Sequence, residues 1–441
     1  MSAERTFVLG LDGVPWYLLE RYVEDGELPN FQRLMEEGSS GPLRSTVPAT
    51  TSLAWPSIAT GTWADQHGSY YFQRVTRDHR IRMNTSADIR VPTLWDVIPS
   101  SVVGNVPMTY PAREIDGTMV TGMLTPDLDA DGSTWPPEYK EEINREIPEY
   151  RIALQWPSYT DDKGAFLGDF EAMVNARQRL MNKLLDAEEW RLFFFVFTAP
   201  DRLQHLFWED DVLLDHYRHL DEILGELLDR LDRMDANLFV VSDHGFGPIS
   251  WSFHPNVLLE RHGFLARKGD TGSRQLLGRI GLEKSHVERV IDRISGGRQK
   301  ALLARLPDRL IDAVADSVPG NSAIYDVDFT RTRAFVHGEG NVYVNDSERF
   351  DGGVVDPEDR AEIKSMLRRL FEGWEDPNTG LRPVVVHDGD DLFPQDDDSP
   401  DLVIACEGEY EPKVLLHDDV VAPAGAKAAS HRPIGVLLAW G

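Results

Sequence analysis

The chain has 441 residues, of which 41% are hydrophobic, enough for a large core spread over two or three structural lobes. It carries 74 acidic and 45 basic residues, and the net charge of −29 argues against a nucleic-acid polymer as partner, because such a partner requires basic patches. No apolar run approaches the length of about 18 residues that a membrane span needs, and the single cysteine, Cys406, excludes an internal disulfide bond.

The excess of acidic residues, with only nine lysines, gives a haloarchaeal-like composition that resembles proteins adapted to a high-salt cytoplasm. At about 1 M salt the Debye length is about 3 Å, so most of this surface charge would be screened. The N-terminal MSAERTFVLGLDG lacks the charged region, long apolar stretch and cleavage site of a signal peptide. We therefore expect a cytoplasmic protein. The sequence gives no indication of its oligomeric state.

Three short apolar segments have the composition of buried parallel strands, and each ends in an aspartate. They are TFVLGLDG (6–13), LFFFVFTAPD (192–201) and LFVVSD (238–243), which lead to Asp12, Asp201 and Asp243. Amphipathic helices are predicted between them, over 166–187 and 211–234. This alternation predicts an α/β fold with a doubly wound, mostly parallel sheet, whose ligands bind beyond the carboxyl ends of the strands. The three aspartates are therefore predicted to lie together at one edge.

The second half of the chain changes in character. Residues 271–318 have the pattern of two or three arginine-rich amphipathic helices, either an insertion that covers the site or a packing appendage. The segment RAFVHGEGNVYVN (333–345) predicts a hairpin that turns at Gly338–Gly340, and a helix is expected over 357–371, capped by Asp356. The acidic run 387–401 is expected to be a solvated loop.

These features divide the chain into four expected regions. They are a catalytic α/β core at 1–265, an inserted helical cap at 266–320, a small α+β segment at 321–400 and a return to the core at 401–441.

The predicted strand ends carry potential metal ligands. In APDRLQHLFW, Asp201 and His205 are four residues apart, so their side chains would lie one above the other on a helix. Together with Asp12 and the Asp243-His244 pair, they place three carboxylates and two imidazoles at one edge of the sheet. Cations would allow the carboxylates to coexist, and Asp and His ligands without Cys are typical of Zn, Mn or Fe rather than Ca.

Two loops could supply a further imidazole and a nucleophile. His431 is expected in a small-residue loop before a strand at 436–439. The segment TVPATTSLAWPSIATG (46–61) clusters hydroxyl groups ahead of a helix, whose first N–H groups would favour a phosphate-sized anion. The residue types do not choose among four candidate nucleophiles, namely Thr46, Thr50, Thr51 and Ser52.

Five motifs, in order along the chain, resemble the signatures of the type I phosphodiesterase/nucleotide pyrophosphatase family of the alkaline phosphatase superfamily. They are VLGLDG, TSLAWPSIATGTWADQHG, FTAPDRLQHLFW, VVSDHGFGP and SHRPIGVLLAWG. The resemblance extends over nearly the whole chain. It implies an alkaline-phosphatase-like doubly wound fold, two metal ions, commonly zinc, and a covalent phospho-threonine or phospho-serine intermediate.

The resemblance also implies a role for each candidate residue. One metal ion would be held by Asp201, His205 and His431, and the other by Asp12, Asp243, His244 and the oxygen of the nucleophile. The family's nucleophile lies nine residues before the Thr of a Thr-Gly pair, which is Thr60 here, so the resemblance identifies Thr51. The expected cofactors are two divalent transition metal ions, zinc first, with manganese or iron as alternatives.

Three departures from the family pattern are visible. Phe72 stands where nucleotide pyrophosphatases carry an Asn that helps to bind the phosphoryl oxygen, as in some prokaryotic branches, which weakens the expectation of a nucleotide substrate. Ala64 replaces a common Pro. Relatives usually continue with another helix and strand after the last histidine strand, whereas this sequence ends at Gly441.

The sequence thus predicts a metal-dependent phosphoric ester hydrolase of the phosphodiesterase/nucleotide pyrophosphatase type, acting on a small phosphate-ester or phosphonate substrate. The alternatives are a phosphomonoesterase, phosphonate hydrolase or phosphomutase of the same superfamily, or a catalytically inactive member. A sulfatase is disfavoured, because its formylglycine requires a C/S-x-P-x-R motif near the front of the chain, and the only cysteine is Cys406.

Overall fold

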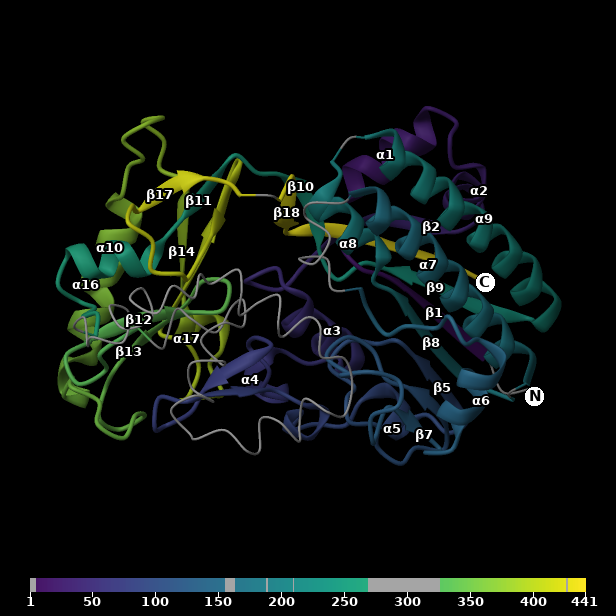
Figure 1. The fold of residues 1–441 in the computed structure, drawn as a ribbon, viewed down its shortest axis with the longest axis horizontal. Helices are drawn as coiled ribbons and strands as arrows, with labels where there is room; N and C mark the ends of the chain where they lie inside the picture. The colour runs from purple at the N-terminus through teal and green to yellow at the C-terminus, as the bar shows by residue number, and fades with distance from the viewer. Residues whose placement is uncertain (1–4, 155–162, 188, 209, 269–325, 426) are drawn as a thin grey trace, which may run out of the picture.

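A computed structural model describes residues 5–154, 163–187, 189–208, 210–268, 326–425 and 427–441 of the chain. Figure 1 shows two lobes, a larger one around a wide sheet and a smaller one formed mainly by later residues. The helical cap expected at 266–320 falls outside the described residues, except for 266–268. None of the helices in the described ranges is long and apolar enough to cross a membrane.

The sheet of the larger lobe has eight strands in the order β2-β19-β9-β1-β8-β5-β6-β7. Strands β9, β1, β8, β5 and β6 run parallel, whereas β19 and β7 are antiparallel to their neighbours. In sheet order the bounds are Ser39–Arg44, Ile434–Trp440, Ala236–Val241, Arg5–Leu11, Leu192–Phe197, Ser101–Gly104, Gly117–Val120 and Thr134–Trp135. The expected doubly wound, mostly parallel α/β sheet is confirmed.

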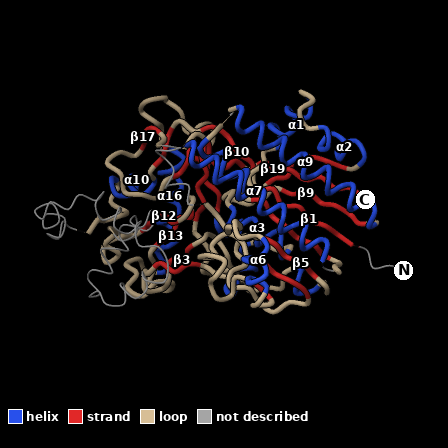
Figure 2. Tube along the Cα trace, turned by 45° about the vertical axis from the view of Figure 1, so that its right-hand side comes forward, coloured by secondary structure: helices blue, strands red, loops and turns tan. Residues whose placement is uncertain are grey.

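Both faces of this sheet are covered, which explains why the sequence of β8 is apolar throughout. Phe193, Phe195 and Phe197 pack into one core, and Phe194 and Val196 into another on the opposite face. The first face is covered by α1 (Trp16–Glu24), α2 (Pro29–Glu37), α6 (Tyr139–Glu146), α7 (Lys163–Ala187) and α9 (Asp211–Met234). The second is covered by α3 (Thr51–Thr60) and α5 (Leu94–Val97). Figure 2 shows α7 and α9 lying across the strands.

The two long helices agree with the sequence pattern. Helix α9 has the predicted bounds, and the side chain of Asp210 caps it by accepting a hydrogen bond of 3.2 Å from the backbone N–H of Val212. Helix α7 begins three residues before the predicted start at residue 166. Two shorter helices lie near the sheet edge, α4 (Ala64–His67) and α8 (Ala199–Leu206).

The smaller lobe is built on an antiparallel sheet in the order β12-β13-β15-β14. Its strands are Ala334–His337, Asn341–Val344, Leu402–Cys406 and Val384–Asp388, and its helices are α10 (Pro255–Arg261), α16 (Arg360–Gly373) and α17 (Gly389–Leu392). The hairpin predicted at 333–345 is confirmed as β12–β13. The helix expected from Pro357 begins as a 3-10 turn over Pro357–Asp359, without a side-chain cap from Asp356, and continues as α16.

The hydrophobic core of this lobe draws on residues 253–265 as well as 327–420. The core of the smaller lobe therefore includes residues from both sides of the predicted boundaries at 265 and 400. The division of the chain into four regions stays a prediction.

The expectation of a solvated acidic loop at 387–401 is wrong for several of its acids. Asp401 is buried and accepts hydrogen bonds from the backbone N–H of Val344, at 2.7 Å, and from Arg360 Nε, at 2.6 Å. Asp396 Oδ2 accepts one from Arg90 Nη1 at 2.7 Å. These carboxylates are paired with arginines that are distant in sequence, so local composition could not identify them as buried.

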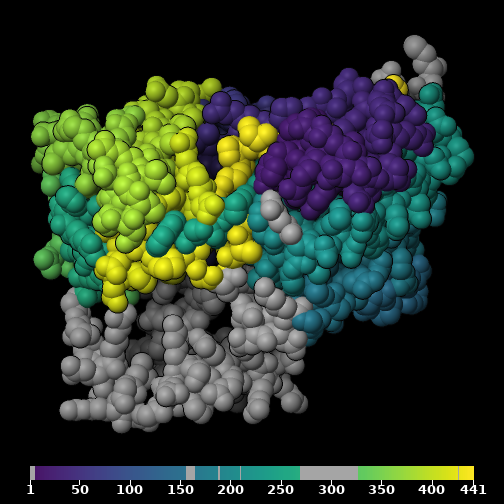
Figure 3. All heavy atoms as spheres, turned by 90° about the horizontal axis from the view of Figure 1, so that it is seen from above, coloured from purple at the N-terminus to yellow at the C-terminus, as the bar shows by residue number. Residues whose placement is uncertain are grey.

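Three smaller sheets complete the described part of the chain. Strand β10 (Gly245–Pro248) pairs with β18 (Ala429–Arg432), β11 (Trp251–Phe253) lies between β16 (Tyr410–Pro412) and β17 (Val421–Pro423), and β3 (Gln73–Val75) pairs with β4 (Ile81–Met83). His431, expected in a loop, lies in β18 opposite Phe246. This segment is a strand because it pairs antiparallel with β10, which comes from another region of the chain. The local sequence around His431 therefore shows no strand pattern. Figure 3 shows the C-terminal segment between the two lobes.

Candidate metal centre

The carboxyl ends of three neighbouring strands bring the three expected aspartates together. Asp12 directly follows β1, Asp201 lies in the first turn of α8 after β8, and Asp243 follows β9 by two residues. All three side chains are buried. Because β9, β1 and β8 are adjacent and parallel, their ends meet at one edge of the sheet.

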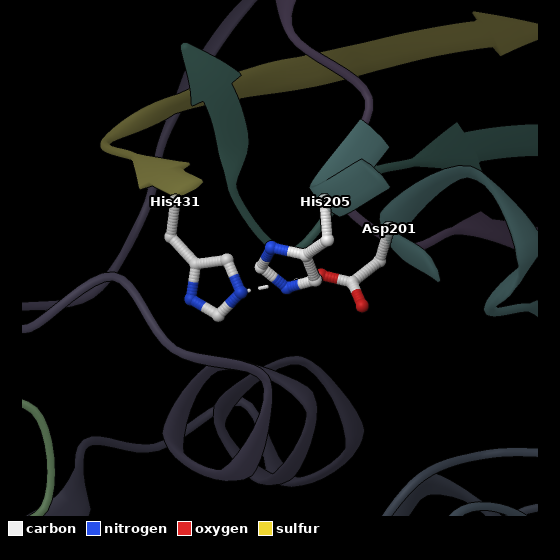
Figure 4. Close-up of side chains that lie close together, drawn as sticks. All are labelled: Asp201, His205 and His431. Carbon is white, nitrogen blue, oxygen red and sulfur yellow. Dashed lines mark hydrogen bonds and ion pairs between the residues drawn. The ribbon is translucent and has the colours of Figure 1, made fainter. Parts of the chain in front are cut away.

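The imidazoles lie among these carboxylates. One cluster contains Asp201, His205 and His431, and another contains Asp12, Asp201 and His244, with one ligand atom of each residue within 4.8 Å of the others. Figure 4 shows that His431 reaches from β18 toward His205 and Asp201 on α8. Asp201 thus belongs to both clusters, whereas the family pattern assigns it to one metal ion only.

Asp243 is held beside the second cluster by the backbone. Its Oδ1 accepts a hydrogen bond of 3.1 Å from the N–H of Gly13, and its Oδ2 lies 3.3 Å from His244 Nε2. Gly13 has a φ of +77°, and a Cβ added there would lie 3.2 Å from the Cα of Asp201. Any other residue at this position would therefore have a strained backbone conformation, and its side chain would be crowded against Asp201.

Backbone carbonyl groups orient two of the histidines in the same way. Nδ1 of His205 lies 3.0 Å from the carbonyl oxygen of Ala429, and Nδ1 of His244 lies 3.0 Å from that of Gly245. Since a carbonyl oxygen only accepts, Nδ1 carries the proton in both rings and Nε2 presents a lone pair. These lone pairs face carboxylates, with His205 Nε2 3.5 Å from Asp201 Oδ1. Such an arrangement is typical of histidines that bind a metal ion through Nε2.

Glu339 orients the third histidine, and the sequence had not identified it as a site residue. Its Oε2 lies 3.2 Å from His431 Nδ1, while His431 Nε2 lies 3.2 Å from Asp201 Oδ1. Glu339 stands at the tip of the β12–β13 hairpin, after Gly338 with a φ of +64°. The available signal was an acidic residue between two glycines in a predicted tight turn.

Among the described residues, two carboxylate oxygens in the site have no hydrogen-bond partner. Trp55 Nε1 donates to Asp12 Oδ2 at 3.0 Å, but Asp12 Oδ1 and Asp243 Oδ2 are buried and unpaired. A buried carboxylate oxygen without a donor is costly, and a bound cation would satisfy both.

The spacing of the donor atoms fits a four-coordinate transition metal ion. Bond lengths of about 2.1 Å to nitrogen and oxygen place the ligands of a tetrahedral site about 3.4 Å apart. The donor atoms in contact include Thr51 Oγ1 and His244 Nε2, 3.2 Å apart, and His244 Nε2 and Asp12 Oδ1, 3.7 Å apart, and the ligand atoms of each cluster all lie within 4.8 Å of one another. The residues therefore fit divalent cations at both clusters.

Burial is the largest influence on the pKa values of these site residues. Burial, and then Asp243, raises the pKa of Asp12 well above its usual range, and burial raises the pKa of Asp243 to about 7. Burial lowers the pKa of His244 to about 4. Burial would also lower the pKa of His431, but Glu339 and Asp201 outweigh it and raise that pKa to about 10.

Among the candidate nucleophiles, Thr51 contacts an imidazole. It is the first residue of α3, and its Oγ1 is 3.2 Å from His244 Nε2. The hydroxyl oxygens of Thr50 and Ser52 lie 3.4 Å from each other, and the hydroxyl of Thr46 donates to the carbonyl of Pro48 at 2.9 Å. Only Thr51 of these four contacts a candidate metal ligand by a side-chain hydrogen bond within the described ranges.

Comparison with known proteins finds a family model that matches most of the chain. The model of the type I phosphodiesterase/nucleotide pyrophosphatase family matches residues 6–419. No curated protein matches the sequence.

The fold is similar to solved structures at low sequence identity. Phosphonoacetate hydrolase from Sinorhizobium meliloti in complex with phosphonoacetate has a TM-score of 0.59 and 15% identity, with 99% of this chain and 90% of that chain covered. Murine ectonucleotide pyrophosphatase/phosphodiesterase 5 has a TM-score of 0.52 and 12% identity, with coverages of 99% and 88%. An inactive variant of that murine protein in complex with AMP gives the same values, with a TM-score of 0.52, 12% identity and coverages of 99% and 88%.

Proposed function

The chain belongs to the type I phosphodiesterase/nucleotide pyrophosphatase family and is a phosphoester hydrolase of the alkaline phosphatase superfamily, and on this premise we propose how its residues act. Asp201, His205 and His431 hold one divalent transition metal ion, and Asp12, Asp243, His244 and Thr51 hold another, with zinc the first candidate. The observation that carries the proposal is the pair of buried, unpaired oxygens, Asp12 Oδ1 and Asp243 Oδ2, among imidazoles that present Nε2 lone pairs.

Thr51 is the proposed nucleophile. Its Oγ1 forms a bond to phosphorus while the bond between phosphorus and the leaving group breaks on the opposite side, which gives a phosphothreonine that water then hydrolyses. Thr51 is supported for this role by its contact with His244 Nε2 and by its place at the start of α3. The unpaired N–H groups of that helix end favour a phosphoryl oxygen.

The other residues orient the reacting groups. The bound cations would lower the pKa of the Thr51 hydroxyl and stabilise charge on the phosphoryl oxygens. Trp55 fixes Asp12 through its Nε1–H, and Gly13 fixes Asp243 through its backbone N–H. Glu339 fixes the ring of His431.

The substrate is proposed to be a small phosphate ester or phosphonate. A cavity of about 810 Å³ is lined by His431 and Glu339 of the site and by Tyr71, Phe72 and Leu124. The similar solved proteins are described as bound to phosphonoacetate and AMP, which differ in size and charge. A phosphonate hydrolase therefore remains the second candidate, favoured by the replacement of the family's Asn by Phe72.

Metal analysis of protein purified without a chelator tests this proposal. We expect close to two transition ions per chain in the wild type, and about one in Asp12→Asn and in His205→Gln. Asp65→Asn is the matched control, because Asp65 is also buried with an unpaired Oδ1 but lies outside both clusters, so it should retain both ions. Absence of transition ions, or binding unaffected by Asp12→Asn and His205→Gln, would contradict the proposal.

A second measurement separates the candidate activities. Phosphodiesters, phosphomonoesters and phosphonates would be assayed with added Zn or Mn in high salt. Hydrolysis of phosphodiesters would identify the protein as a phosphodiesterase, the first candidate. Preferential cleavage of phosphonates would identify it as a phosphonate hydrolase, the second candidate. A protein that holds two ions and hydrolyses none of the panel would contradict the proposed activity.

A further inference from the structure

The cavity beside the metal centre has an unusual charge for this chain. Its lining contains four basic side chains, Arg44, Lys413, Lys427 and Arg432, and three acidic ones, Glu339, Glu407 and Glu411. The whole chain has 45 basic and 74 acidic residues, so basic groups are in excess here although they are a minority overall. Two of the chain's nine lysines, Lys413 and Lys427, line this one cavity.

The backbone fixes Lys427 next to the metal centre. The N–H of Ala428 donates to the carbonyl oxygen of His205 at 2.7 Å, and His205 Nδ1 donates to the carbonyl oxygen of Ala429 at 3.0 Å. Lys427 therefore precedes a segment that is bound at two points to a candidate metal ligand. From there the chain reaches His431 within four residues.

Within the described residues, no carboxylate is paired with the ammonium group of Lys427. No hydrogen bond or ion pair of its ammonium group is found among the residues that the structure describes. The nearby carboxylates are engaged elsewhere, since Glu339 contacts His431 at 3.2 Å and Glu411 Oε2 contacts Lys413 Nζ at 3.0 Å. Burial, and then the charge of Lys413, lowers the pKa of Lys427, as expected for a cation that lacks a close anion.

We propose that Lys427, with Lys413 beside it, binds a second anionic group on the substrate, carried by the part that leaves phosphorus. This rests on the proposed function, because it assumes that the phosphoryl end of the substrate occupies the metal centre. An ammonium group on the cavity wall then meets a carboxylate or a second phosphoryl group carried a few bonds from phosphorus. The ammonium group of a lysine acts as a compact point charge and can bind either of these anions. The titration described below distinguishes the two.

Calorimetric titration of the zinc-loaded protein with three non-hydrolysable ligands tests the inference. The probes are propylphosphonate, with a neutral tail, 3-phosphonopropionate, with a carboxylate, and ethylene-1,2-diphosphonate, with a second phosphonate. We expect at least one anionic probe to bind about tenfold more tightly than propylphosphonate, and the tighter of the two identifies the preferred group. Lys427→Met should remove that difference. Lys268→Met, at an exposed lysine outside the cavity, should keep it.

The possible failures are distinguishable. If all three probes bind the wild type equally, or if Lys427→Met keeps the preference, the inference is wrong while the proposed function stands. If no probe binds, the metal centre does not accept a phosphoryl group, and both the inference and the proposed function are overturned.

Discussion

The orientation of three imidazoles is the residue-level feature on which the proposed site depends. In His205 and His244 the Nδ1–H donates to a backbone carbonyl, whereas in His431 it faces the carboxylate of Glu339 at 3.2 Å. A carboxylate partner makes an imidazole a stronger ligand than a carbonyl partner does. Glu339 is therefore expected to be a positioning residue for the cluster that contains His431.

Replacing Glu339 should weaken zinc binding at that cluster. We expect Glu339→Ala to lower zinc affinity by about 10- to 100-fold, because the ring of His431 loses its fixed orientation. Glu339→Gln should recover most of the loss, since its amide oxygen can still accept the Nδ1–H proton. Competition with a chelator measures the affinity, and Glu411→Gln is the control, because Glu411 lines the same cavity and contacts Lys413. An unchanged affinity in Glu339→Ala would refute this role.

The positions of the site's three aspartates could be predicted from the sequence, because each of them lies just after a predicted strand. Asp12, Asp201 and Asp243 each follow an apolar run, and parallel strands bring their carboxyl ends together. Glu339 and Lys427 could not be found in this way. Both lie in segments whose position depends on contacts between the two lobes, and nothing in their local sequence indicates which residues they face.

At the scale of elements, prediction succeeded where a segment is determined by its own pattern. Helix α9 has apolar residues at helical spacing and a capping Asp210, and β8 is apolar on both faces, so local sequence suffices for both. Strand β18 shows the limit of this approach. Its four residues pair with β10 from another region, and the small residues before His431 indicate a loop when they are considered alone.

The acidic run at 387–401 shows the same limit for charge. A series of aspartates is normally solvated, but Asp401 is buried because Arg349 and Arg360 both donate to it. Arg349 also donates to Asp346 Oδ2 at 2.7 Å. The number of charges was visible in the sequence, but their partners depend on the fold of the smaller lobe.

For the whole molecule, the site lies where the two lobes meet. The larger lobe supplies Asp12, Asp201 and Asp243 from its strand ends, and the smaller lobe supplies Glu339 from a hairpin. The cavity is lined by residues of both. The arrangement of the two lobes should therefore influence both metal binding and the choice of substrate.

The net charge of −29 should make the folded state depend on salt. Acidic groups on a compact surface repel one another, and screening by molar salt weakens that repulsion. We expect the melting temperature to rise by several degrees between low and molar KCl, and equally in NaCl, since screening depends on ionic strength. A melting temperature that does not change with salt would contradict the prediction of a protein adapted to a high-salt cytoplasm.

Trapping the phosphorylated protein tests most directly whether Thr51 attacks phosphorus. Protein quenched in acid during turnover would be digested and its peptides analysed by mass spectrometry. We predict phosphate on Thr51 in the wild type and in Thr50→Ala, and none in Thr51→Ala, whose turnover should fall by at least about a thousandfold. Near-normal turnover in Thr51→Ala, or phosphate on Thr50 or Ser52 instead, would contradict the account.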